Sequence, residues 1–151
     1  MKRIVLISCT SRKQTNKAKA KDLYKGPLFK NSLDYGQSFK PDKIFILSAL
    51  HHLLDLNKVT EPYNVTLSYV PPKKRKIGLK ILTETEKNEW GNKVIEQLKR
   101  EADIHKDEFI VLAGEEYIKP IESYISNLKK PLENKKLGER IKFMQTKNKI
   151  C

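Results

Sequence analysis

The sequence has few cysteines, no long apolar run and a shortage of acidic residues. Its two cysteines, Cys9 and Cys151, lie far apart and lack the spacing of a zinc site or a disulfide framework, so we expect two free thiols. The apolar run Ile4–Ile7 near the N-terminus is too short for a signal-peptide core or a membrane span. These absences predict a cytoplasmic protein with no membrane association and no metal or organic cofactor.

The shortage of acidic residues leaves a large excess of positive charge. The chain has 31 Lys and Arg against 18 Asp and Glu, which gives a formal charge of +13 and a pI near 9.7. Such an excess attracts polyanions and strengthens contacts with phosphates. A lysine-rich proteome or a need for solubility is the alternative explanation, but we expect nucleic acid as the partner. The charge favours neither DNA nor RNA and indicates no oligomeric state.

The apolar pattern predicts one α/β domain over residues 1–151. Three continuous apolar runs, Ile4–Ile7, Ile44–Leu47 and Phe109–Leu112, are typical of strands that are buried on both faces. Helical stretches separate them, which favours a three-layer fold with a mostly parallel sheet and helices on both faces. Functional sites in such sheets gather at the carboxyl ends of the strands, here near Ser8, Ser48 and Gly114.

Helices are expected to begin near Pro27, at the capping box Thr83–Glu86, at Glu115 and near Leu137. Trp90 lies on the apolar face of the second of these and is expected in the core. The third is expected to continue to Leu128, with Pro120 near its start or at a kink. The segment His51–Leu82, which contains Pro71 and Pro72, is expected to be irregular.

The loop Ser8–Lys13 follows the first strand and combines hydroxyls, a thiol and two cations. Its backbone N–H groups, together with Arg12 and Lys13, suit a phosphate. The loop is not a P-loop, because the glycines and the final Gly-Lys-Ser/Thr are missing. A solvated turn that caps a helix explains the residue types equally well.

Two histidines, His51 and His52, follow the second strand. Either imidazole can act as a general acid or base, and we select His51 as a catalytic candidate. Adjacent histidines point in different directions in most backbone conformations, so a joint metal site is not expected. A packed structural histidine is an equally good interpretation.

The sequence Glu61-Pro62-Tyr63 combines a carboxylate, a rigid turn and an aromatic ring that can stack on a base. Glu61 is the carboxylate best suited to work on a glycosidic bond, since such chemistry needs an anion to stabilise a sugar cation or activate water. A structural turn is the alternative. The basic run that contains Lys73, Lys74 and Arg75 is either a solvated loop or a contact with the nucleic-acid backbone.

Five segments, taken in order and spacing, resemble a small YaaA-like family of unknown-function proteins over almost the whole chain. They are ISCTSRK, DLYKGPLFK, DKIFILSALHHLLDLNKVTEPYNVTL, EFIVLAGEEY and PLENKKLGERIKFM. Distant relatives that the chain is similar to are the YaaA peroxide-stress proteins, which bind DNA, and an accessory portion of archaeosine synthases, which modify a deazapurine in transfer RNA. The resemblance implies a glycosylase-like version of the α/β fold.

The matching positions imply a substrate site made of Ser8, Cys9, Lys13, Tyr24, Ser48, Tyr63, Gly114 and Tyr117. The family's usual Lys-Tyr-Gly-Leu after Ser-Ala is replaced here by Leu50, His51, His52 and Leu53, so no role is carried over for that lysine and glycine.

Residue chemistry and resemblance together predict an N-glycosidase that acts on a nucleobase in DNA or RNA. Glu61 or His51 would stabilise the sugar cation or activate water, Tyr63 would stack on the extruded base, and the cationic loops would hold the backbone. The alternatives are a non-catalytic DNA- or RNA-binding protein that grips an unstacked base and a hydrolase of small nucleotides.

Overall fold

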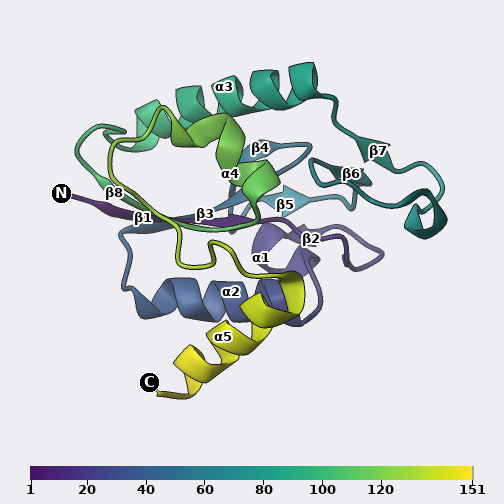
Figure 1. The fold of residues 1–151 in the computed structure, drawn as a ribbon, viewed down its shortest axis with the longest axis horizontal. Coiled ribbons are helices and arrows are strands. Elements are labelled where there is room, and N and C mark those ends of the chain that lie inside the picture. Colours follow the sequence, from purple (N-terminus) through teal and green to yellow (C-terminus); the bar gives the residue numbers. More distant parts are fainter. Residues whose placement is uncertain (151) are drawn as a thin grey trace.

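The computed structural model describes residues 1–150, so the expected free thiol of Cys151 lies outside the described residues. It has a five-stranded sheet between two layers of helices (Figure 1), as the sequence predicts. The strand order is β4-β3-β1-β8-β9, and every pairing in the sheet is parallel except that of β4 with β3. The strands are β1 Arg3–Ser8, β3 Lys43–Ser48, β4 His52–Asp55, β8 Glu108–Leu112 and β9 Leu128–Lys129.

The three predicted strands form the centre of this sheet. Ile4–Ile7 of β1 and Phe109–Leu112 of β8 are buried, and so are Phe45–Ser48 of β3. Helices α2 (Pro27–Ser38) and α5 (Leu137–Ile150) lie on one face, and α3 (Glu84–Glu101) and α4 (Glu115–Glu122) lie on the other (Figure 1). None of the helices in residues 1–150 combines the length and the apolar character that crossing a membrane requires.

The helix starts agree with the sequence prediction. Pro27 occupies the first turn of α2, and the side chain of Thr83 accepts a hydrogen bond from the backbone N–H of Glu86 in a complete capping box. Trp90 is buried, as expected. Its indole N–H donates to the carbonyl oxygen of Ser48 at 2.8 Å, which ties α3 to the end of β3.

Two segments differ from the prediction. The helix from Glu115 ends at Glu122 rather than Leu128, because the chain turns there and Leu128–Lys129 pairs with β8 as an edge strand. The segment His51–Leu82 contains β4, which follows β3 through a tight turn. It also contains three shorter strands and a turn of 3₁₀ helix: β5 Val59–Thr60, β6 Val65–Thr66, β7 Lys80–Ile81 and Pro72–Lys74.

Short pieces complete the architecture. Strand β2 (Ala18–Lys19) pairs with β5, and α1 (Ala20–Leu23) follows β2 directly. Strands β6 and β7 pair with each other and hold the base of a long excursion, residues 68–79, which we call the basic arm. This arm lies beyond the carboxyl ends of the central strands, where the sequence predicts the site.

Candidate functional site

The expected strand-end residues share one edge of the sheet. Ser8 at the end of β1 pairs with Leu47, the neighbour of Ser48, and Ile7 pairs with Leu112, two residues before Gly114. The chain leaves β1 towards α2 on one face and leaves β8 towards α4 on the other. This divergence opens a crevice between the two strand ends, which is where doubly wound sheets bind ligands.

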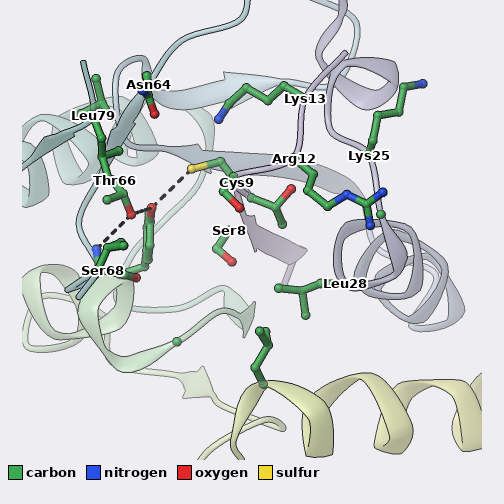
Figure 2. A pocket seen from close by; sticks show the side chains of 18 of the residues that line it. Ser8, Cys9, Arg12, Lys13, Lys25, Leu28, Asn64, Thr66, Ser68 and Leu79 are labelled. Atoms are coloured by element: carbon green, nitrogen blue, oxygen red, sulfur yellow. Dashed lines mark hydrogen bonds between the residues drawn. The ribbon is translucent and has the colours of Figure 1, made fainter. Parts of the chain in front are cut away.

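A pocket of about 580 Å³ occupies this crevice. Its walls come from the loop Ser8–Lys13, the start of α2, the basic arm, the start of α4 and the start of α5. Lys13 and Cys9 point into the pocket from one side, and Thr66 and Ser68 lie on the opposite side (Figure 2). The volume lies within the usual range of about 300–1,000 Å³ for small-molecule and cofactor sites.

The charge of this pocket is uniformly positive. The cations that line it are Arg12, Lys13, Lys25, Lys74, Lys76 and Arg140. No Asp or Glu is among the lining residues that the structure describes, and none of these six cations forms a salt bridge within residues 1–150. We therefore call it the cationic pocket.

The salt bridges of the described residues involve cations outside this pocket. Glu108, at the opposite end of β8, contacts both Arg3 and Lys129. Glu116 of α4 binds Lys87 of α3 at 2.6 Å. Such pairs neutralise cations away from the cationic pocket, whose own lining cations have no carboxylate partner among the described residues.

Two arginine side chains of the pocket each pack against a glycine at the start of a helix: Arg12 against Gly26 before α2, and Arg140 against Gly114 before α4. A side chain at Gly26, where φ is +98°, would meet the Arg12 side chain at 3.2 Å, and a Cβ at Gly114 would meet the Arg140 guanidinium at 3.1 Å. Neither glycine supplies a side-chain cap to its helix. The glycines therefore let each arginine approach the backbone closely at the pocket wall.

Lys13 has an unusual environment for a lysine. Its Nζ lies 4.5 Å from the centre of the Tyr63 ring and 5.7 Å from that of Tyr24. Burial lowers the pKa of the Lys13 ammonium; Cys9 opposes this shift, and the nearby Lys76 adds to it. A bound anion would favour the charged form, so anion binding and the protonation of Lys13 are coupled.

A chain of hydroxyl groups lies behind Lys13. Buried Ser48 donates its Oγ–H to the Tyr63 hydroxyl at 2.8 Å, and the hydroxyl oxygens of Tyr63 and Tyr24 are 2.6 Å apart. The Ser48 Oγ also accepts the backbone N–H of His51 at 3.0 Å. Burial raises the pKa of both phenols, and Cys9 raises them further, so both tyrosines remain protonated.

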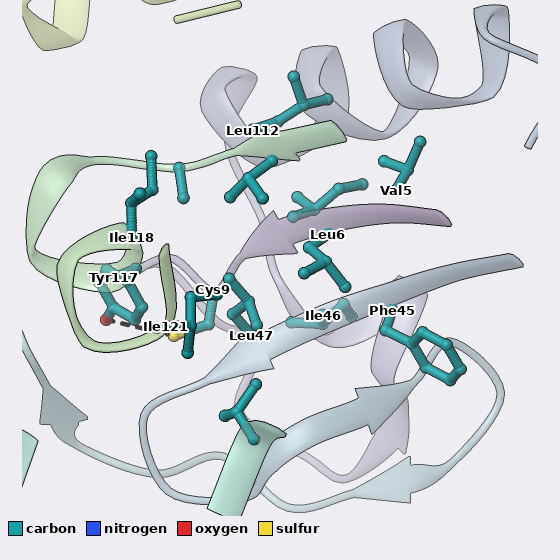
Figure 3. Packing of buried hydrophobic residues seen from close by; sticks show 14 of the residues in the cluster. Val5, Leu6, Cys9, Phe45, Ile46, Leu47, Leu112, Tyr117, Ile118 and Ile121 are labelled. Carbon is teal, nitrogen blue, oxygen red and sulfur yellow. Dashed lines mark hydrogen bonds between the residues drawn. The ribbon is translucent and has the colours of Figure 1, made fainter. Parts of the chain in front are cut away.

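Cys9 and Tyr117 meet at the floor of the pocket. The Cys9 Sγ lies 3.5 Å from the Tyr117 hydroxyl, beside the apolar side chains of Leu47 and Ile121 (Figure 3). Thr66 Oγ1 is 3.4 Å from the same hydroxyl. Burial raises the pKa of Tyr117 well above its ordinary value. Thr10 Oγ1, also on the lining, is buried without a hydrogen-bond partner within residues 1–150.

A second pocket, of about 550 Å³, lies on the other side of Tyr63. It is lined by His51, Glu61 and Tyr63 among others, and the rings of His51 and Tyr63 meet edge to face at 5.4 Å. Glu61 is exposed and forms no hydrogen bond or ion pair with the described part of the chain. Burial, with help from Lys58, lowers the pKa of His51, so its imidazole is neutral near pH 7 and suited to accept a proton.

The profile of a family of unknown function, DUF6884, matches residues 4–146. The chain belongs to this family. No curated protein matches the chain, and no solved structure does either. The match to DUF6884 spans the central sheet except Arg3, and both pockets. The resemblance to the YaaA-like family stays a prediction.

In this DUF6884 member the predicted site residues fall into three groups. The cationic pocket is lined by Ser8, Cys9, Arg12, Lys13, Lys74, Gly114 and Tyr117. The second pocket is lined by His51, Glu61 and Tyr63. Ser48 and Tyr24 lie in the hydroxyl chain between the pockets, and Lys73 and Arg75 lie on the basic arm beside Lys74.

Several pocket residues were not singled out from the sequence. Lys25 was expected only as one of the lysines of the stretch from Ser11 to Lys25, which the sequence places at the pocket mouth, and Lys76 belongs to the basic run already noted. Arg140 gave no local signal, because it reaches the pocket only through the packing of α5. Within residues 1–150 no cluster of three His, Cys, Asp or Glu side chains is arranged to hold a metal ion.

Proposed function

We propose that this protein binds single-stranded DNA or RNA and holds a phosphate-bearing nucleotide unit in the cationic pocket. The observation that carries the proposal is the lining of that pocket, where the described part of the chain contributes six cations and no carboxylate. A surface made basic only for solubility would intersperse the two signs of charge. Concentrated, unpaired cations in a cavity focus the positive potential on one place, which suits a phosphate.

The cations outside the pocket favour binding of a nucleic-acid strand over binding of a single nucleotide. Cations continue outside the pocket along the basic arm, at Lys73 and Arg75, and both are exposed. From Pro62 to Thr83 the chain contains five cationic residues and no acidic one. A track of charge that leads away from a pocket fits successive phosphates of a polymer.

The test is the salt dependence of binding to a labelled single-stranded oligonucleotide. Replacing both Arg12 and Lys74 with glutamine removes two pocket cations. Each phosphate contact on a single strand contributes about 0.7 to the slope of log K against log salt, so the magnitude of the slope should decrease by about 1.4. The matched control replaces Lys99 and Arg100, exposed at the end of α3, and makes the same change in net charge. Equal losses in both double variants would show that only the overall charge matters and would contradict the proposal.

An N-glycosidase remains the second candidate, because the two predicted catalytic residues and Tyr63 line one pocket. The proposed strand site is next to it, since Asn64 lines the cationic pocket and the preceding Tyr63 lines the other. A nucleotide adjacent to the held phosphate would then bring its glycosidic bond to Glu61, with neutral His51 as the proton acceptor for water.

Mass spectrometry of bases released from normal and modified nucleic acids tests this candidate. Glu61→Gln keeps the shape and removes the charge, so base release should fall about a hundredfold or more while strand binding is retained. Glu96→Gln, on the exposed face of α3, is the control. Full base release by a folded Glu61→Gln variant would show that Glu61 is not the catalytic anion. If the wild type released no base, the N-glycosidase candidate would be rejected and only the binding function would remain.

A further inference from the structure

The aromatic ring chosen from the sequence for base stacking is already engaged. One face of the Tyr63 ring is approached by the Lys13 Nζ at 4.5 Å, and the His51 ring meets it edge to face. Its hydroxyl is hydrogen-bonded to Ser48 and lies next to that of Tyr24. Tyr63 therefore acts as a wall between the two pockets and has little free surface for a base.

Another tyrosine is free for that role. Tyr69, on the basic arm, is 70% exposed, although its neighbours Ser68 and Val70 line the cationic pocket. The ring thus offers a large, flat apolar surface, and covering it with a ligand would be favourable. Tyr69 is therefore adjacent in the chain to the lining of the pocket that the proposed function assigns to a phosphate, while its own ring is not part of that lining.

Tyr69 is also held in place. The guanidinium carbon of Arg75 lies 5.7 Å from the centre of its ring, and the Arg75 Nε donates to the carbonyl oxygen of Val70 at 2.7 Å. This hydrogen bond closes the turn from Val70 to Arg75, which directly follows Tyr69. Arg75 thus covers part of the ring and limits its movement, while most of the ring surface remains in solvent.

The surroundings indicate what covers the ring. The arm carries Lys73, Lys74, Arg75 and Lys76 and has no acidic residue, so an acidic ligand is favoured and an apolar protein surface alone is not. A planar group that is attached to an anionic backbone matches both the ring and the charge. A nucleobase in a single strand is such a group, because its faces are free to stack, whereas in a duplex they are covered by neighbouring bases.

We propose that Tyr69 and Arg75 form a stacking platform for one unpaired base of the strand whose phosphate occupies the cationic pocket. The inference rests on the proposed function and adds the residues that contact a base of the strand. Stacking is tolerant of sequence, since every base has a flat face, so the platform would not select one base strongly.

The test compares two labelled oligonucleotides of equal length at one salt concentration. One carries thymine bases, and the other has abasic units throughout, so both have the same phosphate charge. Tyr69→Ala should weaken binding of the thymine strand about 5- to 150-fold, the range expected for the loss of one base–aromatic stack, and leave the abasic strand unchanged. Tyr69→Phe, which keeps the ring, should bind both strands as the wild type does.

Tyr124→Ala is the matched control. Tyr124 is also exposed, at 45%, but follows α4 and donates its hydroxyl to Asn92 Oδ1 at 3.2 Å. Equal binding of the thymine strand by Tyr69→Ala and wild type would overturn the platform, and so would an equal loss on both strands, which would indicate a change in the arm itself. If the wild type bound neither strand, the proposed function would fail as well, so the two failures are distinct.

Discussion

A single methyl group added at Gly91 would show how firmly α3 positions the site-bearing helix α4. The ideal Cβ at Gly91 would lie 2.4 Å from the carbonyl oxygen of Pro120 and 2.7 Å from its Cβ. Both distances are far below van der Waals contact, and the closer atom belongs to the backbone, so no side-chain rotation relieves the clash. One of the two helices has to move.

The size of the effect follows from two opposing terms. Alanine gains about 1 kcal/mol over glycine in a helix interior. Overpacking of a close contact costs about 1–3 kcal/mol, and a backbone clash belongs at the upper end of that range. The net loss for Gly91→Ala is therefore about 2 kcal/mol, or a decrease in Tm of about 4–8 °C for a chain of this length.

Urea denaturation measures this loss, with Gly138→Ala as the control. Gly138 also lies in a helix, α5, but its Cβ would meet nothing within 4 Å, so alanine there should stabilise the protein slightly. Helix α4 carries Tyr117, whose hydroxyl contacts the buried Cys9 thiol, so a shift of α4 should expose this thiol. Gly91→Ala should therefore make Cys9 react faster with a thiol reagent, measured in a Cys151→Ser background so that Cys9 is the single cysteine. A Gly91→Ala variant as stable as Gly138→Ala would refute the reasoning.

Two further predictions concern charge. Burial lowers the pKa of Lys13, so as the pH rises towards the ordinary value of 10.5 strand affinity should begin to fall earlier than expected for an ordinary lysine. In Lys13→Arg, which keeps its charge, affinity titrations should show no such early fall. The second prediction concerns the start of α3, where Lys80 and the N-terminal backbone at Thr83 lower the pKa of Glu86 to about 2. Its stabilising effect is present above the ordinary value of 4.5 and is lost as the pH falls towards 2, so Glu86→Gln should reduce the urea midpoint at neutral pH and not in strong acid; an equal reduction at both would contradict this.

The centre of the fold was predictable because its signals are local. Strands β1, β3 and β8 are buried on both faces, so each is a continuous apolar run, and α3 begins with a complete capping box. Strands β4 and β9 were missed because they have only four and two residues, too few for a period to be recognised. The helix predicted from Glu115 to Leu128 was too long because the short strand β9, which contains Leu128, was not recognised.

The site was predictable only in part. Ser8 and Gly114 line the same pocket because parallel strands end at one edge, which follows from the pattern of runs. The division of Glu61 and Lys13 between two pockets depends on the path of the chain from Glu61 to Asn64, which no residue pattern specifies. Arg140 enters through the docking of α5 on α2, a tertiary contact between distant segments.

The hydrogen bond from Trp90 to the end of β3 gives the protein an optical probe of its own. Trp90 is the single tryptophan of the chain, and its indole N–H is bound to the carbonyl oxygen of Ser48. The hydroxyl of the same serine contacts Tyr63, which lines the second pocket and whose ring is approached by Lys13 of the cationic pocket. Fluorescence emission from an indole responds to the polarity and hydrogen bonding around it, so occupation of either pocket can be followed in the unlabelled protein by exciting one residue.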